Sequence, residues 1–251
     1  MSTSAGRTLD LLSLVATSDR PLGLMELVEM SGMDKSTTSR LLGFLVDRGY
    51  LLRDPLTKRY EVGAALVAFA AASLNRSELR ASTADHLRRL CTVTGETTSL
   101  HLRVGTERIC IDGAESSQPV RRVLSIGEQV PLYLSPTGKV ILAFLAPAEA
   151  QPALDAARAA GIDMVALKAT LAQIRTERYM AAIGDRTLGV AAVSVPLSDR
   201  NGAPVASMTI AGPGERWTMA RMLEFLPQLR EAAELISPRF GVTAARIVTV
   251  A

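Results

Sequence analysis

The chain has 251 residues, of which 48% are hydrophobic and 21% are charged. This length and balance are typical of a folded protein with two compact domains, and they exclude a chain that is mainly disordered. The net charge of +3 is small, so the chain as a whole lacks the strongly basic character of many nucleic-acid binders.

Three short helices are predicted in the first fifty residues. Apolar spacing and stop signals place them over residues 9–15, 24–30 and 34–48. Asp34 is a suitable N-cap for the third helix, and Gly49 is a suitable stop. Two helices joined by a short turn and followed by a third helix are consistent with a helix-turn-helix unit.

A predicted hairpin follows the third helix, with strands over residues 50–53 and 58–62 around a turn at 54–57. Residues 35–60 contain six basic and two acidic residues, a net charge of +4 that exceeds the charge of the whole chain. Short helices followed by a basic hairpin are the elements of a winged helix-turn-helix. We therefore expect this region to bind double-stranded operator DNA.

The third helix and the hairpin carry the residues that we expect to contact DNA. They are Lys35, Ser36, Thr37, Ser39 and Arg40 on the helix and Arg53, Lys58 and Arg59 on the hairpin. Small hydroxyls and cations near a helix N-terminus suit the major groove, where arginine can bond guanine through two N–H groups. The alternative is a solvated basic surface without a partner, but the clustering of charge on the hairpin beside the helix favours DNA.

Residues 62–75 form an alanine-rich stretch of 14 residues without charge. The stretch predicts a helix over 63–74 that is apolar on nearly every face, which favours packing against a second subunit or a neighbouring domain. It is shorter than the roughly 20 residues that a membrane helix needs, and residues 1–7 lack the pattern of a signal peptide. We therefore expect a cytoplasmic protein without a membrane segment, in which this helix links two domains.

The remainder mixes helices with strands that are joined mostly by hairpins, which predicts an α+β domain. The predicted strands cover residues 97–103, 107–114, 189–197 and 205–211, and the predicted helices cover 87–93, 137–145, 167–183 and 219–236. The Asn201-Gly202 pair between the last two strands is a strong hairpin signal. We predict a DNA-binding domain over residues 1–62, a linker helix over 63–76 and a second domain over 77–251.

The motifs of nucleotide-binding enzymes are incomplete in this sequence. Residues 135–139 suggest a phosphate loop, but Tyr133 replaces its first glycine and Val140 replaces its magnesium-binding hydroxyl. Trp217 occupies the third glycine position of a dinucleotide fingerprint that Gly212 would open. We therefore expect a protein that is not an enzyme and that holds no cofactor.

Histidine and cysteine are too few for a catalytic or metal site. His86 is expected on the surface of a polar helix, and His101 is expected in a strand, in the core or at its edge. Cys91 and Cys110 cannot form a zinc cluster or a disulfide framework. Cys110 is interpreted as a small buried hydrophobe, with contact to a ligand left open.

Several short motifs occur once each along the chain, and their order and spacing are specific when taken together. They are LDLL at 9–12, LMEL at 24–27, MDKSTTSRLL at 33–42, GY at 49–50, YEVG at 60–63, GEQVPL at 127–132, TGK at 137–139, ILAF at 141–144, residues 189–196, Gly202, and AGP at 211–213. In this the chain resembles the IclR-type bacterial transcriptional regulators over roughly residues 5–241. The resemblance implies an N-terminal winged helix-turn-helix, a linker helix and a C-terminal GAF-like domain that binds a small-molecule effector, in a homodimer or a tetramer.

The resemblance also implies an effector pocket lined by Tyr133, Pro136, Thr137, Gly138, Ala182, Val190, Ala192, Thr209 and Ala211. Family members that bind small keto acids often have an acidic residue at Ala182, cysteine at Ala192, and serine at Thr209 and Ala211. Because only Thr209 keeps a hydroxyl here, we expect a less polar pocket and a larger effector such as an aromatic acid or amide. Tyr133 would stack on its ring, and backbone N–H groups at the start of the 137–145 helix would bind one of its oxygens.

The implied function is that of a ligand-responsive regulator, expected to repress a catabolic operon. The alternative is a constitutive DNA-binding protein whose second domain only dimerises and whose pocket is non-functional. A ligand that binds only the folded state raises its melting temperature, so a thermal-shift screen of metabolites separates the two functions.

Overall fold

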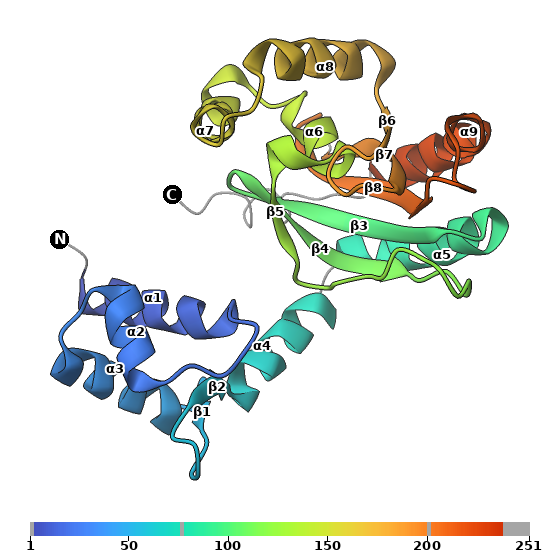
Figure 1. The fold of residues 1–251 in the computed structure, drawn as a ribbon. Helices are drawn as coiled ribbons and strands as arrows, with labels where there is room; N and C mark the ends of the chain where they lie inside the picture. The colour runs from blue at the N-terminus through green and yellow to red at the C-terminus, as the bar shows by residue number, and fades with distance from the viewer. Residues whose placement is uncertain (1–2, 76–77, 200–201, 238–251) are drawn as a thin grey trace. The chain divides into compact units, whose positions relative to one another are not determined.

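The computed structural model of the protein describes residues 3–75, 78–199 and 202–237. The chain divides into two compact units, Met1–Arg76 and Ser77–Ala251. Separate hydrophobic clusters lie in the two units, and Figure 1 shows both with their helices and strands labelled.

The first unit is a helix-turn-helix with a two-stranded hairpin and a following helix. Its elements are α1 (Ser4–Ala16), α2 (Leu24–Ser31), α3 (Lys35–Asp47), β1 (Leu51–Arg53), β2 (Tyr60–Val62) and α4 (Ala64–Asn75). Asp34 caps α3, because its carboxylate accepts the N–H of Thr37 at 2.8 Å. The core lies between the helices and the hairpin, where Leu11, Leu42 and Tyr60 are buried.

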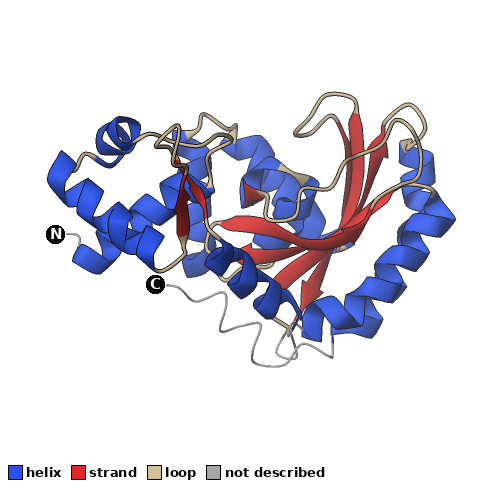
Figure 2. Cartoon of the chain, turned by 90° about the horizontal axis from the view of Figure 1, so that it is seen from below, coloured by secondary structure: helices blue, strands red, loops and turns tan. Residues whose placement is uncertain are grey.

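The second unit is built on an antiparallel sheet of six strands in the order β5-β4-β3-β8-β7-β6. Figure 2 shows the curl of this sheet. The strands are β3 (Thr97–Val104), β4 (Glu107–Ala114), β5 (Gln129–Pro131), β6 (Met180–Ile183), β7 (Val190–Ser198) and β8 (Pro204–Pro213). The helices are α5 (Glu78–Thr94), α6 (Pro136–Leu142), α7 (Pro147–Ala159), α8 (Met164–Glu177) and α9 (Met219–Ile236), with a 3₁₀ turn η1 (Leu132–Leu134) before α6.

The two faces of this sheet have different neighbours. Helices α5 and α9 contact each other and the sheet, and the Thr98 hydroxyl of β3 donates to Leu87 O of α5 at 2.8 Å. Side chains alternate along a strand, so Thr97, Ser99 and His101 lie on the opposite face. Helix α6 contacts β4, β6, β7 and β8, and a hydrophobic cluster joins it to α7 and α8. A cavity lies between α6 and this face of the sheet.

The predicted helix over 167–183 is wrong at its C-terminal end. Helix α8 ends at Glu177, Arg178 adopts the left-handed conformation at φ 59°, and residues 180–183 form the edge strand β6. The segment MAAI lacks the alternation that would separate a strand from a helix. The sequence also left α7 and β5 unpredicted. Asn201 of the predicted turn lies outside the described residues.

In the described part of the chain, no helix is long and apolar enough to cross a membrane.

Candidate DNA-binding surface and effector cavity

Helix α3 separates a buried apolar side from a polar side. Thr38, Leu41, Leu42 and Leu45 are buried against the first unit's core, which follows from their spacing of three and four residues. The predicted DNA contacts lie on the other side: Lys35, Ser36, Ser39 and Arg40 are exposed, and Thr37 is half-buried. The structure therefore brings the five predicted α3 residues to one end of the helix.

The three predicted residues of the hairpin have different surroundings. Lys58 is exposed at the turn, where its backbone adopts φ 59°. The Arg53 guanidinium lies over the Tyr60 ring, 5.4 Å from its centroid, and its Nε donates to Lys58 O at 3.4 Å. Arg59 instead holds the hairpin to α2 through Glu26. Lys58 and Arg53 thus remain the cations that the hairpin presents to solvent.

Arg59 takes part in an ion-pair network around Glu26 of α2. Its Nη1 lies 2.8 Å from Glu26 Oε2 and donates to Pro21 O at 2.9 Å. Arg20 binds the other oxygen of Glu26 at 2.6 Å. The Arg20 bond, followed by the Gly23 N–H bond, lowers the pKa of Glu26 to about 2, so this contribution to stability is lost only as the pH falls from about 4.5 toward 2.

A cavity of about 80 Å³ lies in the second unit between α6 and the concave face of the sheet. Strands β3, β4, β6, β7 and β8 form its floor, α6 covers one side, and residues 115–128 and 184–189 cover the rest. We call residues 115–128 the cover segment. The lining residues are Thr97, Ser99, His101, Arg108, Cys110, Arg122–Ser125, Glu128, Ser135–Thr137, Ala182, Asp185–Thr187, Val190, Ala192, Thr209 and Ala211.

Seven of the nine residues expected in the effector pocket line this cavity. They are Pro136, Thr137, Ala182, Val190, Ala192, Thr209 and Ala211. Tyr133 lies outside the lining, because its ring belongs to the hydrophobic cluster of α6, α7 and α8. It is therefore not placed to stack on a bound ring.

Gly138 also lies outside the lining, and it has a packing role instead. A Cβ at this position would lie 2.4 Å from Leu132 O, so only glycine allows α6 to approach η1 this closely. Two of the N–H groups at the start of α6 are already occupied, since Gly138 N and Lys139 N donate to Ser135 O at 3.1 and 2.9 Å. The first turn of α6 is thus capped by Ser135.

Three hydroxyls meet at the α6 side of the cavity. Thr209 Oγ1 lies 2.8 Å from Ser194 Oγ and 3.2 Å from Thr137 Oγ1, and all three side chains are buried. Lys139 Nζ lies 2.7 Å from Asp185 Oδ1, which balances the charge of that carboxylate. This side of the cavity is polar and nearly neutral.

The β4 side of the cavity carries a cluster of charges that the sequence did not reveal. Glu128 accepts from Arg108 Nη1 at 3.2 Å through Oε2 and from Arg186 Nη2 at 2.9 Å through Oε1. Arg122 Nη2 lies 3.7 Å from the same Oε1. Burial alone would raise the pKa of Glu128, but the bond and charge of Arg186 and the charge of Arg108 lower it overall.

Two further side chains complete this end of the cavity. Burial, and then the charges of Arg108, Arg122 and Arg186, hold the pKa of His101 well below its ordinary value. Burial likewise raises the pKa of the Cys110 thiol to about 11, so both groups are neutral near pH 7. Charged groups at the β4 side thus stand opposite the alanines that led to the expectation of a less polar pocket, and that expectation did not include them.

One sequence signal could have located this polar wall. Thr97, Ser99 and His101 stand at every second position of a buried strand, where apolar residues are expected. Polar residues on one face of such a strand indicate that this face meets a polar cavity. The basic residues Arg108 and Arg186 show no comparable pattern in the sequence.

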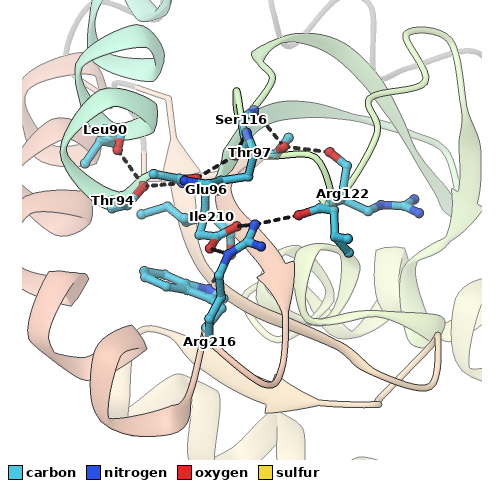
Figure 3. Close-up of polar contacts among 12 residues, drawn as sticks. Leu90, Thr94, Glu96, Thr97, Ser116, Arg122, Ile210 and Arg216 are labelled. Atoms are coloured by element: carbon cyan, nitrogen blue, oxygen red, sulfur yellow. Dashed lines mark hydrogen bonds and ion pairs between the residues drawn. The ribbon is translucent and has the colours of Figure 1, made fainter.

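The cover segment is held by polar contacts to Thr97 of β3 and to Arg216, which Figure 3 shows. Thr97 Oγ1 accepts the Ser116 N–H at 3.1 Å and donates to Arg122 O at 2.6 Å. Arg216 Nη2 lies 3.0 Å from Glu96 Oε2 and donates to Val120 O at 2.7 Å. These bonds fix residues 116–122 of the cover segment and thereby place Arg122 at the cavity.

A helix-turn-helix unit with a basic hairpin, followed by an α+β unit with a curled sheet, defines a transcriptional regulator with a separate second domain. The model of the IclR helix-turn-helix domain matches residues 4–55, and the model of the bacterial transcriptional regulator IclR C-terminal domain matches residues 71–238. The chain belongs to the IclR family of bacterial transcriptional regulators, whose members are not enzymes.

Individual relatives agree with this assignment. The HTH-type transcriptional regulator BhcR of Paracoccus denitrificans is 31% identical, over 94% of this chain and 86% of its own. The transcriptional repressor IclR of Escherichia coli K12 is 28% identical, over 95% of this chain and 90% of its own. The crystal structure of an IclR family regulator from Brucella abortus shares the fold, with a TM-score of 0.83, 22% identity and coverage of 96% and 94%.

Proposed function

We propose that this protein is a ligand-responsive repressor and that its effector occupies the cavity of the second unit. The observation that carries the proposal is the lining of that cavity, where buried charged and hydroxyl groups converge from strands β3, β4 and β8 and from the start of α6. A cavity kept only as a remnant would be expected to fill with apolar neighbours, because buried polar groups are costly without partners. The alternative remains a constitutive DNA-binding protein with a non-functional pocket.

Operator binding is proposed to require two copies of the chain. Two α3 helices related by a two-fold axis would read half-sites about one helical turn or a multiple of it apart. The exposed side chains of Arg40 and Ser36 on α3 would face base edges, while Lys58 and Arg53 on the hairpin would meet the phosphate backbone. A homodimer or a dimer of dimers fits this arrangement.

Arg40→Ala is expected to weaken operator binding by about 1–3 kcal/mol and to relax the preference at one base pair. Lys58→Ala is expected to weaken binding to all sequences alike and to reduce the salt slope by about one. Arg59→Ala should change that slope less, because bonds to Glu26 and Pro21 hold the Arg59 guanidinium at α2. Fluorescence anisotropy with the duplex upstream of the gene and with random duplex, over a salt series, measures all three. Equal wild-type affinity for both duplexes contradicts the proposal of specific binding.

The response to ligand is tested on the protein–operator complex. Small carboxylates and hydroxybenzoates are added one by one, and the active compound is expected to release the DNA and to raise the melting temperature. Thr209→Val keeps the side-chain shape but removes a cavity hydroxyl, so it should reduce the response while leaving DNA affinity unchanged. If no compound of a broad metabolite set changes DNA affinity or melting temperature, the constitutive alternative holds.

A further inference from the structure

The charges around the cavity do not balance. Arg108, Arg122 and Arg186 share one carboxylate, that of Glu128, while Asp185 is neutralised by Lys139. Three cations against one anion leave a net charge of +2 beside the cavity. Arg108 is buried, and a buried charge without full compensation is costly, so this arrangement favours a ligand that brings negative charge.

Arg108 has donors without a protein acceptor. Its side chain is only 3% exposed, and its Nη1 already contacts both Glu128 and His101. Its Nε is buried with no hydrogen-bond partner, and within the described residues no bond is found for Nη2. An arginine that is held on one side and left with N–H groups on the other is prepared to bind an anion.

His101 sets the direction of a hydrogen-bond chain that ends at the cavity. Arginine can only donate, so His101 Nδ1 accepts from Arg108 Nη1 at 3.0 Å. The neutral ring then carries its proton on Nε2, which donates to Ser99 Oγ at 2.8 Å. Ser99 therefore keeps its own O–H for donation, and this side chain lines the cavity. Arg108 and Ser99 both present donors.

The cations lie at two places. Arg108 binds Oε2 of Glu128, whereas Arg186 and Arg122 lie near Oε1 and are about one-third exposed. The Glu128 carboxylate stands between the two groups, so they do not converge on one point as a phosphate would require. The volume of about 80 Å³ holds roughly five to eight water-sized groups. Size and charge together fit a short molecule with an anionic group at each end.

We propose that the effector is a dicarboxylate of two to four carbon atoms and that Arg108 is the residue that selects it. One carboxylate accepts from Arg108 and Ser99, and the other accepts from Arg122 and Arg186. This proposal rests on the proposed function, since it takes the cavity as the effector site. It replaces the aromatic effector that was expected from Ala182, Ala192 and Ala211, where family members often have polar residues.

Calorimetric titration of the full chain tests the selection. Malonate and succinate are titrated against propionate and butyrate, which have the same carbon numbers and one carboxylate each, with inorganic phosphate and 4-hydroxybenzoate as further ligands. We expect one dicarboxylate to bind at least about tenfold more tightly than its matched monocarboxylate, because the second carboxylate adds charge-assisted hydrogen bonds. Equal binding of both acids, or tighter binding of phosphate or hydroxybenzoate, overturns the proposal.

Variants connect the preference to Arg108. Arg108→Gln is expected to reduce dicarboxylate affinity about tenfold to a hundredfold and to abolish the preference. The control is Arg121→Gln, which removes the same charge from the cover segment at a residue that pairs with Glu115 and does not line the cavity. It should stay within about twofold of wild type. Because Arg108→Gln changes a buried ion pair, Ser99→Ala, which removes one cavity donor and no charge, is measured beside it and should lose several-fold affinity; the melting temperature of each ligand-free variant shows that it is folded. Full affinity in both cavity variants overturns the assignment.

The outcomes also separate this proposal from the proposed function. If hydroxybenzoate or a monocarboxylate binds and releases operator DNA while the dicarboxylates do not, the regulator is ligand-responsive but the dicarboxylate proposal fails. If no acid and no other metabolite binds or changes DNA affinity, the proposed function fails as well.

Discussion

Phe69→Glu is expected to dissociate the proposed dimer into single chains and to lower operator affinity at least about tenfold, since one chain then reads one half-site. Phe69 lies on α4 and is 59% exposed, although its ring contacts Tyr50 at a centroid distance of 5.9 Å. Val67 on the same helix is 63% exposed. Exposed apolar side chains on a helix without charges indicate that a second surface covers them. A carboxylate buried there would cost several kcal/mol.

Light scattering and DNA binding in the same buffer check this expectation. The matched control is Ser13→Glu, which adds the same charge at an exposed polar position of α1 in the same unit. The control should leave both the molecular mass and the operator affinity near the wild-type values. An unchanged mass for Phe69→Glu would show that Phe69 does not lie at the subunit contact.

Gly138→Ala is expected to destabilise the second unit by roughly 1–3 kcal/mol or more. The added Cβ would lie 2.4, 2.7 and 2.8 Å from three backbone atoms of Leu132, and backbone cannot move aside as a flexible side chain can. The first turn of α6 would then shift away from η1, together with Thr137 at the cavity. Ligand affinity should therefore fall along with stability.

Trp217 is a specific probe for this measurement, because it is the only tryptophan of the chain and is fully buried in the second unit. Denaturant unfolding followed by its fluorescence should show a lower midpoint for Gly138→Ala. Gly43→Ala is the control: a Cβ there meets nothing within 4 Å, and the residue lies in α3 of the other unit. It should leave the Trp217 transition unchanged. An equal midpoint for wild type and Gly138→Ala would mean that η1 and α6 can separate without cost.

The DNA-binding unit was predictable because its signals are local. Asp34 caps α3, and Gly32 and Gly49 follow α2 and α3 in left-handed conformations that glycine adopts readily. The spacing of Thr38, Leu41 and Leu45 marks the buried side of α3 within two turns. Each of these features depends on residues a few positions apart. The sequence therefore determined where the helices and the hairpin lie.

The role of a charged residue depended on more distant partners. Arg59 and Lys58 are adjacent basic residues of the hairpin, and nothing local separates them. In the fold, Arg59 reaches Glu26 and Pro21, more than thirty positions earlier in the chain. Lys58 stays exposed. Only the tertiary structure shows that Arg59 anchors the hairpin and that Lys58 does not, which leaves Lys58 for the proposed DNA contact.

The cavity shows most strongly that local sequence signals predict the elements, whereas contacts between distant residues decide what their side chains do. By itself the sequence determined an α+β domain and, through family resemblance, the segments around Thr137, Ala192 and Thr209 that face a pocket. It did not bring Arg108 of β4 to Glu128 and Arg186, because those residues are distant in sequence and carry no shared periodicity. Antiparallel pairing and the curl of the sheet place them around one space. The charge of that space, and hence the class of ligand proposed for it, was decided by tertiary structure alone.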